Sequence, residues 1–471
     1  MSTRTHTAKD DSGESTRHPW RENVEALVVA IAVALLFKYF VLEISKIPSG
    51  SMQPTLMGNP ETGVFDRVLV DKLSMRMRDP ERFEIVVFKH PVENSRIMVK
   101  RLVGMPGEDL RIENGDLWTR PDADSPWQIL RKPENVQETA WRTLEIADPK
   151  VSGWTKISGT GIVKASGRDL EASGPATIRF RADESSIRDR YTDGYPDALR
   201  NGVRPQVPRM AEGRNDVSDL RVRGEARLED GVEALVCRLS EDRFTYEFRI
   251  PGPAAPADAR ASVEVREDDR QVARIESETA LQLRAGRSAA FAFWNLDDAL
   301  GLRIGDTTLA LDVAAVSEQR SGIELELVGA GGTIDGLTVE RDVHYIAPNR
   351  GAWEVTIPEG HYVVLGDNTQ DSADSRDWRA QRWDHADGTE ITGNFRDRGE
   401  NPTEVTAAGG EKWTRFRDRW GEVHWFAAGE AQGGLPYRAP LVPRELIQGR
   451  AVATFWPLKP WKGVWRLGWL H

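Results

Sequence analysis

The sequence is poor in the residues that build disulfide frameworks and metal centres. Among 471 residues there is one cysteine, Cys237, and the eight histidines are scattered with no pair at the spacing of metal ligands. A single thiol cannot form an internal disulfide, and we expect no metal and no other cofactor. Cys237 follows Ala234 and Val236 in an apolar alternation, so we predict a core residue rather than a nucleophile.

The chain also lacks a block of basic residues. Its formal net charge is -11, and lysine and arginine are spread along the whole length. Duplex binding depends on clustered Lys and Arg side chains, so nucleic acid is not an expected partner. The length is enough for two or three domains, and no internal repeat is visible.

Long apolar runs are scarce, and the one at residues 26–42 is interrupted only by Lys38. With residues 24 and 25 included, the segment reaches the ~17–25 residues that cross a bilayer. We therefore predict a transmembrane helix over 24–42, behind a polar tail at 1–23. A cleaved secretory signal is the alternative, but the run is long and no small-x-small site follows it. A buried core helix is a further alternative.

Basic residues near this segment predict its orientation. Arg4, Lys9, Arg17 and Arg21 precede the segment and only Lys46 follows closely, although acidic residues of the tail dilute the bias. Short flanking segments rich in Lys and Arg stay in the cytoplasm. We expect a single-pass protein of the cytoplasmic membrane, with its N-terminus inside and the large C-terminal part on the outer face.

A serine-containing stretch follows the apolar run closely. Residues 47–56 read IPSGSMQPTL, and Ser51 lies nine residues beyond Leu42. Nine residues span at most ~30 Å, so Ser51 should lie at or near the outer membrane surface. The stretch is either an ordinary Pro/Gly/Ser turn or the site of a nucleophile.

A lysine is embedded in the next apolar segment. Lys100 lies in IMVKRLVG at 97–104, with Met98 and Leu102 on the same face of the predicted strand. It is either an edge residue or a buried general base. At its ordinary pKa of ~10.4, only about 1 in 2,500 lysines is neutral at pH 7, a cost of ~4.6 kcal/mol. Desolvation can lower the pKa of a lysine by up to ~3–5 units, which would remove most of that cost.

A loop dense in Ser and Asp follows a third strand. Residues 363–376 read VVLGDNTQDSADSR, a strand that runs into a Gly-Asp-Asn turn. This is either an ordinary polar loop or a structured one. The Asp374/Arg376 pair favours a structured loop. Two further strands are predicted at 64–70 and 85–88.

The order of these motifs resembles that of bacterial type I signal peptidases. That family carries a membrane span, a P-S-G-S-M-x-P-T-L box, a D-x-V-x-V segment, an I-V-V-F segment, a K-R-x-x-G-x-P-G-[DE] box and a G-D-N-x-x-x-S-x-D-S-R box. All six occur here in that order, within residues 24–118 and 345–376. Residues 441–451 also resemble the family's closing segment.

The resemblance implies roles for the matched residues. Ser51 would be the nucleophile, and Lys100 the general base that takes its proton. The backbone N–H of Ser51 and the hydroxyl of Ser49 would form the oxyanion hole, and Ser372 would orient Lys100. This is a Ser-Lys variant of serine-protease chemistry that needs no histidine.

The same resemblance implies a supporting role for the Ser- and Asp-rich loop. Asp367 and Asn368 would shape its turn, and Asp374 would pair with Arg376 to hold it. The chain departs from the family's usual residues at Phe83-Glu84 and Thr369-Gln370. Neither departure falls on a matched catalytic position, so we expect altered loop geometry rather than lost activity.

Much of the chain lies outside these motifs. From residue 220, short apolar alternations recur at roughly 8–12-residue spacing between Gly- and Asp-containing turns, which is typical of a β-sandwich. They include residues 220–228, 244–250, 263–265, 281–283, 309–313 and 323–327. The pattern resembles a concanavalin/laminin-G-like sandwich, which would either bind a glycan or envelope protein or serve as a spacer.

We therefore predict a mainly β chain with a signal-peptidase-type β-barrel or sheet as its catalytic core, one N-terminal transmembrane helix and an inserted β-sandwich. The expected segments are a cytoplasmic tail at 1–23, the transmembrane helix at 24–42, a first core part at 43–119, an irregular insertion at 120–215, the sandwich at 216–346, a second core part at 347–376, a second insertion at 377–437 and a C-terminal core segment at 438–471. The Trp-rich end of the last segment suits either a membrane interface or core packing.

By resemblance, the function is that of a membrane-anchored serine endopeptidase that removes signal peptides from exported preproteins. Preproteins and the lipid bilayer are the expected partners. One alternative is a membrane-tethered glycan- or envelope-binding protein with a non-catalytic peptidase-like core. Another is a Ser-Lys peptidase that acts on a regulatory protein, although the predicted anchor argues against it.

Overall fold

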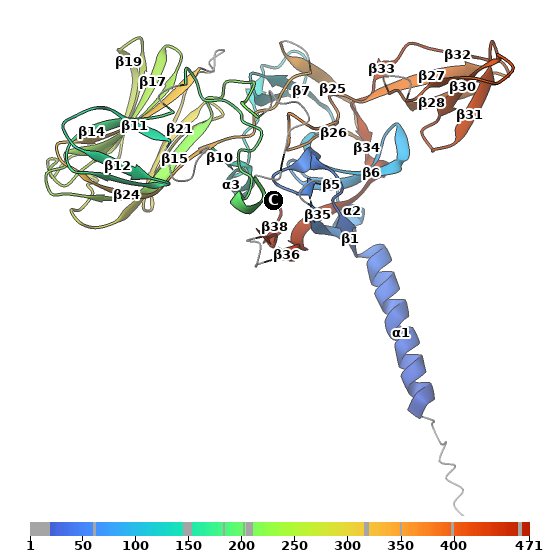
Figure 1. The fold of residues 1–471 in the computed structure, drawn as a ribbon, viewed down its shortest axis with the longest axis horizontal. Coiled ribbons are helices and arrows are strands. Elements are labelled where there is room, and N and C mark those ends of the chain that lie inside the picture. Colours follow the sequence, from blue (N-terminus) through green and yellow to red (C-terminus); the bar gives the residue numbers. More distant parts are fainter. Residues whose placement is uncertain are drawn as a thin grey trace, which may run out of the picture.

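The computed structural model shows a mainly β protein with one long N-terminal helix (Figure 1). It describes residues 19–59, 63–144, 153–181, 184–200, 203, 211–314, 320–348, 351–396, 400–459 and 464–471. Most of the predicted N-terminal tail lies outside these residues. The sandwich, the core and the second insertion lie in a row, and the helix projects away from the core (Figure 1).

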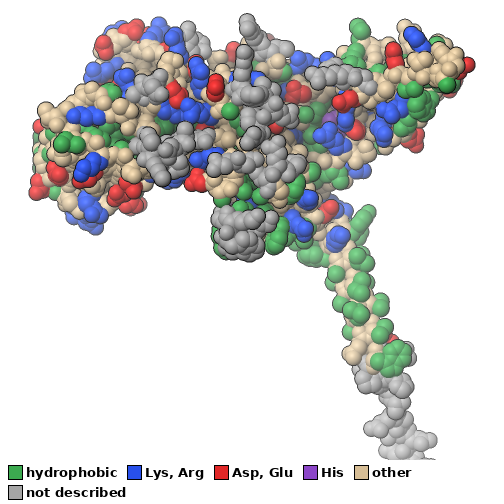
Figure 2. All heavy atoms as spheres, in the orientation of Figure 1, with side chains coloured by type: hydrophobic (Ala, Val, Ile, Leu, Met, Phe, Trp, Pro, Cys, Tyr) green, Lys and Arg blue, Asp and Glu red, His purple; other side chains and the backbone are tan. Residues whose placement is uncertain are grey.

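Helix α1 covers Pro19–Phe40, so it ends two residues before the predicted boundary at Leu42. Its apolar side chains are exposed on all sides, and Figure 2 shows them along the projecting helix. Within the described residues it is the one helix long and apolar enough to cross a membrane. Its length and composition are those of a membrane-spanning helix.

The core is built around an antiparallel sheet that joins segments from both ends of the chain. Its strand order is β1 (Leu42–Lys46), β4 (Arg67–Asp71), β35 (Ile447–Trp456), β5 (Ile85–His90), β6 (Glu93–Gly104), β26 (His361–Leu365) and β34 (Val442–Pro443), with β38 (Gly468–Trp469) paired to β35. Strands β5 and β6 are rich in Val, Ile and Phe and are mostly buried, which favours central positions.

Smaller elements complete the core. A second sheet has the order β25 (Trp353–Ile357), β7 (Glu108–Glu113), β8 (Asp116–Arg120) and β9 (Gln128–Ile129). The short elements are η1 (Gly50–Met52), α2 (Ser74–Met77), α3 (Glu134–Ala140), η3 (Arg444–Leu446) and the two-stranded pairs β2 (Gly58–Asn59) with β3 (Val64–Phe65) and β36 (Leu458–Lys459) with β37 (Val464–Trp465).

The inserted domain is a two-layer β-sandwich. One sheet has the order β12 (Val163–Ser166), β13 (Asp169–Ala172), β24 (Gly332–Arg341), β15 (Leu220–Leu228), β20 (Ala289–Leu296), β21 (Ala299–Ile304) and β22 (Thr307–Asp312), with β10 (Arg142–Thr143) paired to β24. The other has the order β11 (Trp154–Ser158), β14 (Ala176–Phe180), β23 (Ser321–Val328), β16 (Ala234–Glu241), β17 (Phe244–Pro251), β18 (Ser262–Glu267) and β19 (Arg270–Glu276). A single apolar core fills the space between the sheets and includes Cys237, which is fully buried as predicted.

Two expectations for this region are wrong. Strands β11 to β14 lie inside residues 120–215, which were expected to be irregular, and they extend both sheets of the sandwich. Conversely, Leu281 and Leu283 belong to no strand. Their backbone N–H groups bond to the carbonyls of Ala259 and Pro251 in a loop, and their side chains anchor that loop on the core.

The second insertion, at 377–437, forms two small sheets that project from the core on the side away from the sandwich (Figure 1). They contain β27 (Arg379–His385), β28 (Glu390–Asn394), β32 (Ala431–Gly433) and β33 (Tyr437–Arg438), and β29 (Thr403–Thr406), β30 (Lys412–Arg417) and β31 (Val423–Ala427). In the C-terminal tail, Arg466 binds the Asp66 carboxylate of the core, while Trp465 and Trp469 stay exposed. The tail thus combines core packing with an exposed aromatic surface.

Candidate active site

The turn that carries Ser51 is fixed by buried apolar neighbours. Ser51 lies in η1, and Ile47, Met52 and Leu56 pack together in one core cluster. Strand β1 ends at Lys46 and leads directly into this turn, so only a short segment connects α1 to Ser51. Ser51 remains partly exposed, whereas Met52, Gln53 and Pro54 after it are buried.

Lys100 is fully buried on β6, among the apolar side chains that the sequence indicated. Met98 and Leu102 belong to one buried cluster, and β6 contacts η1. Burial lowers the pKa of Lys100 to about 8, although the Asp374 carboxylate opposes the shift. At pH 7 roughly one lysine in ten is then neutral, so the cost of the neutral form falls from ~4.6 to roughly 1.4 kcal/mol.

A short hydrogen-bonded chain holds the end of Lys100. Its Nζ donates to Ser372 Oγ at 2.9 Å, and Ser372 Oγ donates to Asp374 Oδ2 at 2.7 Å. Arg376 binds the same carboxylate through Nε at 2.8 Å and Nη2 at 2.7 Å. Burial alone would raise the pKa of Asp374, but the Arg376 guanidinium outweighs it and the net pKa is lowered. Asp374 therefore stays ionised.

Asn368 connects the supporting loop to the turn of Ser51. Its backbone N–H donates to Ser51 O at 3.2 Å, and its Nδ2 donates to Gly50 O at 3.0 Å. Two hydrogen bonds to adjacent carbonyls fix both the position and the tilt of η1. These bonds therefore tie the loop after β26 to the turn of Ser51, although the two lie more than 300 residues apart in sequence.

Asp367 is buried in an ion pair on the other side of the loop. Arg101 Nε and Nη2 donate to its two carboxylate oxygens at 2.9 and 2.8 Å, and Thr55 Oγ1 donates to Oδ2 at 2.6 Å. Burial raises the pKa of Asp367, but the Arg101 charge dominates and the result is about 2. Because Thr55 belongs to the serine stretch and Arg101 follows Lys100, this carboxylate links both halves of the site.

Gly366 lets the supporting loop approach the turn closely. A Cβ added there would lie 2.3 Å from Ser51 O and 2.2 Å from Ser372 Oγ. Its backbone N–H donates to Asp374 Oδ2 at 2.9 Å. Any side chain would separate the two segments that carry Ser51 and Ser372, so glycine is required by close approach rather than by an unusual φ.

All eight site residues proposed from the sequence fall in this region, on η1 and the residue before it, on β6 and on the loop after β26. Two hydrogen bonds that the proposed roles would suggest are absent among the described residues. Between the described side chains of Ser51 and Lys100 the structure shows no hydrogen bond. Ser49 is exposed, and its side chain makes no capping hydrogen bond to η1.

The sequence analysis missed several residues that contact the site. Tyr195 OH donates to Gln53 Oε1 at 2.8 Å, Asn368 Nδ2 donates to Tyr191 OH at 3.1 Å, and Arg142 Nη2 donates to Thr55 Oγ1 at 3.0 Å. All three come from the segment expected to be irregular. The sequence offered only Tyr191 and Tyr195 within a polar stretch as a sign of these contacts. Two tyrosines show no helical or strand periodicity that would predict them.

Among the described residues, two groups of Asp, Glu and His side chains bring their ligand atoms within 4.8 Å of one another. They are Asp116 with Asp219 and Asp297, and Asp418 with Glu422 and His424. Lys132 binds Asp342 and lies 4.0 Å from Asp297, so the first group already has a cation beside it. A search for His and Cys spacing in the sequence does not reveal such groups.

A comparison with known families matches the parts of the chain that build this site. The model of the family described as "Signal peptidase, peptidase S26" matches residues 20–146 and 314–394. These segments contain Ser51, Lys100 and Ser372, and between them lies most of the sandwich. These two segments are thus similar to type I signal peptidases, and most of the inserted sandwich lies outside the match.

Individual relatives agree with the family match. The chain is 37% identical over 116 residues to "Probable signal peptidase I-2" of Synechocystis sp., which covers 23% of this chain and 49% of the relative. It is 34% identical over 105 residues to "Signal peptidase I" of Leptolyngbya laminosa, covering 21% and 48%. The chain therefore spans about half the length of the curated relatives it matches.

Solved structures resemble the chain only distantly. A toad ovary galectin in complex with N-acetylgalactose has a TM-score of 0.21 and 13% identity, covering 26% of this chain and 88% of the galectin. The carbohydrate binding module CBM66 from Bacillus subtilis has a TM-score of 0.25 and 15% identity, covering 40% and 96%.

Proposed function

We propose that this protein is a membrane-anchored serine endopeptidase that removes N-terminal signal peptides from exported preproteins, with Ser51 as nucleophile and Lys100 as general base. The observation that carries the proposal is the fully buried Lys100, with its pKa lowered to about 8 and its Nζ bound to Ser372. A purely structural lysine gains nothing from being held dry and partly neutral. The family match and the names of the relatives support the same reaction.

In the proposed reaction, neutral Lys100 Nζ accepts the Ser51 hydroxyl proton as Oγ attacks the scissile carbonyl. Because Lys100 donates to Ser372 Oγ, one of its N–H bonds is fixed and its lone pair is directed elsewhere. Collapse of the tetrahedral intermediate breaks the C–N bond, and Lys100 returns the proton to the leaving amine. Lys100 then activates the water that hydrolyses the acyl-enzyme.

The oxyanion would be bound by the Ser51 backbone N–H and the Ser49 hydroxyl. Ser49 is exposed and its hydroxyl makes no capping bond, so it is available to a substrate oxygen. Losing one such donor typically costs ~10²–10³ in rate. Replacing Ser49 by alanine should lower kcat by that factor, with a threonine variant retaining more activity than the alanine.

The anchor restricts which substrates reach the site. β1 follows α1 almost directly and β1 ends five residues before Ser51, so a membrane-spanning α1 would keep the site close to the membrane surface. We propose that α1 spans the cytoplasmic membrane with the N-terminus in the cytoplasm and the core on the outer face. The substrate would be a preprotein still held in the bilayer by its signal segment.

The test is a processing assay on a preprotein in lipid vesicles with the full-length chain. Wild type should release the mature product, and Ser51→Ala and Lys100→Ala should not. Lys89→Ala is the matched control, because Lys89 is an exposed lysine on neighbouring β5 and its loss should change nothing. Cleavage by folded Lys100→Ala would contradict the proposed base, and cleavage by Ser51→Ala would contradict the nucleophile.

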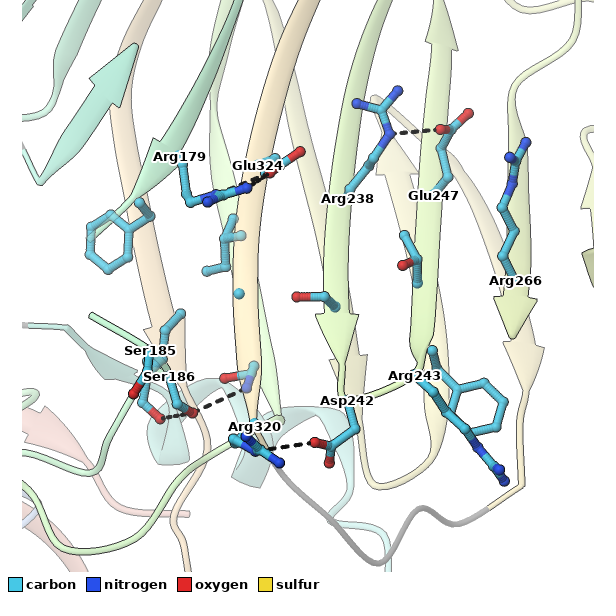
Figure 3. A pocket seen from close by; sticks show the side chains of 18 of the residues that line it. Arg179, Ser185, Ser186, Arg238, Asp242, Arg243, Glu247, Arg266, Arg320 and Glu324 are labelled. Carbon is cyan, nitrogen blue, oxygen red and sulfur yellow. Dashed lines mark hydrogen bonds and ion pairs between the residues drawn. The ribbon is translucent and has the colours of Figure 1, made fainter. Parts of the chain in front are cut away.

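A groove on the sandwich favours a second, additional function in binding. It has a volume of about 1240 Å³ and crosses strands β14, β23, β16, β17 and β18. Figure 3 shows arginine and carboxylate side chains alternating along its floor, such as Arg179 with Glu324 at 2.5 Å and Arg238 with Glu247 at 2.9 Å. Such an array offers donors and acceptors side by side with nearly balanced charge, which suits a neutral polyhydroxylated chain.

We propose a glycan of the cell envelope as the groove's ligand. A glycan array followed by calorimetry on the best ligand would test this. Arg238→Ala should lower its affinity at least tenfold, and Arg274→Ala, on the same sheet outside the groove, should not. Equal affinities in the two variants would contradict a site in the groove. Glycan binding without preprotein cleavage would instead favour the binding-protein alternative.

A further inference from the structure

A segment of the insertion passes beside the nucleophile turn. Residues 184–200 run from the sandwich to the core and end in the short helix α4 (Asp197–Arg200). The rings of Tyr191 and Tyr195 stack with their centroids 6.0 Å apart, and both pack with Met57 of the core. Both tyrosines are buried, so their hydroxyls need partners within the protein.

Tyr195 finds its partner in the serine stretch itself. Its hydroxyl donates to Gln53 Oε1 at 2.8 Å, and Gln53 is buried two residues after Ser51. The backbone N–H of Gln53 closes η1 by donating to Gly50 O at 3.0 Å. Tyr195 therefore holds the residue that terminates the turn of the nucleophile.

Tyr191 acts on the same turn from the supporting loop. Its hydroxyl accepts from Asn368 Nδ2 at 3.1 Å and donates to Asp371 Oδ2 at 3.3 Å. The same Asn368 amide donates to Gly50 O at 3.0 Å. Farther along, Gln370 Nε2 donates to Asp189 O at 2.5 Å. The segment thus contacts both halves of the site.

The other end of the segment is fixed in the sandwich. The Asp189 carboxylate accepts from the backbone N–H groups of Arg214 and Asn215 at 2.8 Å each, and from Asn215 Nδ2 at 2.7 Å. Ser186 Oγ accepts from Ser321 N at 3.1 Å, at the edge of the groove (Figure 3). A segment anchored at one end in a rigid sandwich can transmit that rigidity to the turn it contacts at the other.

We propose that residues 184–200 are a positioning arm, through which the inserted sandwich fixes the turn of Ser51 and sets the rate of the chemical step. The inference rests on the proposed peptidase function. Tyr191 and Tyr195 touch no reacting atom and act through Asn368 and Gln53, so they are positioning residues. The sandwich thereby gains a role in catalysis that does not depend on any ligand of its own.

The expected signature is a change in kcat without a change in KM. Reaction rates depend steeply on the position of the attacking atom, whereas substrate binding spreads over many contacts. Tyr191→Phe and Tyr195→Phe keep the rings and remove only the hydroxyls. Each should lower kcat about tenfold and leave KM within twofold. Both should also slow acylation of Ser51 by a serine-directed reagent by the same factor.

The matched control is Tyr246→Phe, in full-length protein throughout. Tyr246 is a buried tyrosine of the sandwich core whose hydroxyl donates to Glu241 at 2.8 Å, far from Ser51. It should lower the melting temperature at least as much as either arm variant, with kcat unchanged. Equal kcat in wild type, Tyr191→Phe and Tyr195→Phe would overturn the inference even if wild type cuts the preprotein.

A double-mutant cycle separates the arm from a general loss of stability. If Tyr191 acts through Asn368, adding Tyr191→Phe to Asn368→Ala should lower kcat by less than twofold beyond Asn368→Ala alone. Fully additive losses would show that Tyr191 acts by another route and would also overturn the inference.

Wild type and Ser51→Ala are measured in the same assay. If the wild type leaves the preprotein intact, both the proposed function and the inference are overturned. If Ser51→Ala is inactive but Tyr191→Phe and Tyr195→Phe cleave as fast as wild type, only the inference is overturned.

Discussion

Lys100 Nζ donates a hydrogen bond to Ser372 Oγ at 2.9 Å, across 272 residues of sequence. The lysine is fully buried, and the Ser372 hydroxyl donates its own hydrogen bond to the ionised Asp374 carboxylate. The direction of these bonds matters, because a lysine that donates to an oriented hydroxyl is held without being forced to stay charged. A direct bond from Lys100 to the Asp374 carboxylate would favour the charged form and raise its pKa instead.

The activity should therefore rise with pH around the pKa of Lys100. The reactive form of Lys100 is the neutral amine, and burial lowers its pKa to about 8. Below that pH the lysine is mostly protonated, so kcat/KM should increase about tenfold per pH unit and level off above about 8. The check is a pH profile on a substrate without titratable groups near the cut. A flat profile between pH 6 and 9 would contradict the assignment of the base.

Ser372→Ala should lower kcat by about 10- to 100-fold with little change in KM, which is part of the ~10²–10⁴-fold that a positioned general base contributes. The substitution removes the partner of Lys100 and leaves both the lysine and Asp374 in place. A threonine variant keeps the hydroxyl and should recover part of the loss. Steady-state kinetics on the three proteins provide the measurement, and equal kcat in alanine and threonine variants would show that the hydroxyl has no role.

Gly366→Ala should abolish processing while leaving the sandwich folded. The added Cβ would lie 2.3 Å from Ser51 O and 2.2 Å from Ser372 Oγ, and the Ser51 backbone cannot give way without displacing η1. Gly409→Ala is the control, because a Cβ there meets nothing within 4 Å. Processing assays with thermal melts would compare the two. Activity of Gly366→Ala within tenfold of the control would contradict the close approach.

The surroundings of Lys100 could be read in part from the local pattern. The sequence left Lys100 either at an edge or buried beside Met98 and Leu102 on its strand face, and all three are buried. The Asp374–Arg376 ion pair, which the family resemblance implied, is present. Strand periodicity places Met98, Lys100 and Leu102 on one face because they lie close in sequence.

Contacts between distant segments could not be predicted in the same way. Arg101 meets Asp367 across 266 residues, and neither residue signals its partner. Strands β11 and β12 lie at sheet edges with mostly exposed side chains, and at five and four residues each is too short to give a strong periodic signal. The arm at 184–200 is held by hydroxyl and amide hydrogen bonds, which leave no hydrophobic period to detect.

The buried Arg101–Asp367 pair should make stability fall at acid pH. Burial raises the pKa of Asp367, but Arg101 outweighs it and gives about 2, below the ordinary value of 3.8. A depressed folded-state pKa contributes stability that is fully present above pH 4 and is lost as pH falls toward 2, amounting to about 2 kcal/mol. Asp367→Asn should cost about 3–5 kcal/mol of folding free energy at pH 7, because it leaves Arg101 without its charge partner.

Denaturant unfolding of wild type and variant between pH 2 and 7 would measure both effects. Asp384→Asn, at an exposed pair with Arg382, is the control and should change stability by less than about 1 kcal/mol. If wild type and Asp367→Asn lost stability in parallel between pH 4 and 2, Asp367 would not be the group that titrates.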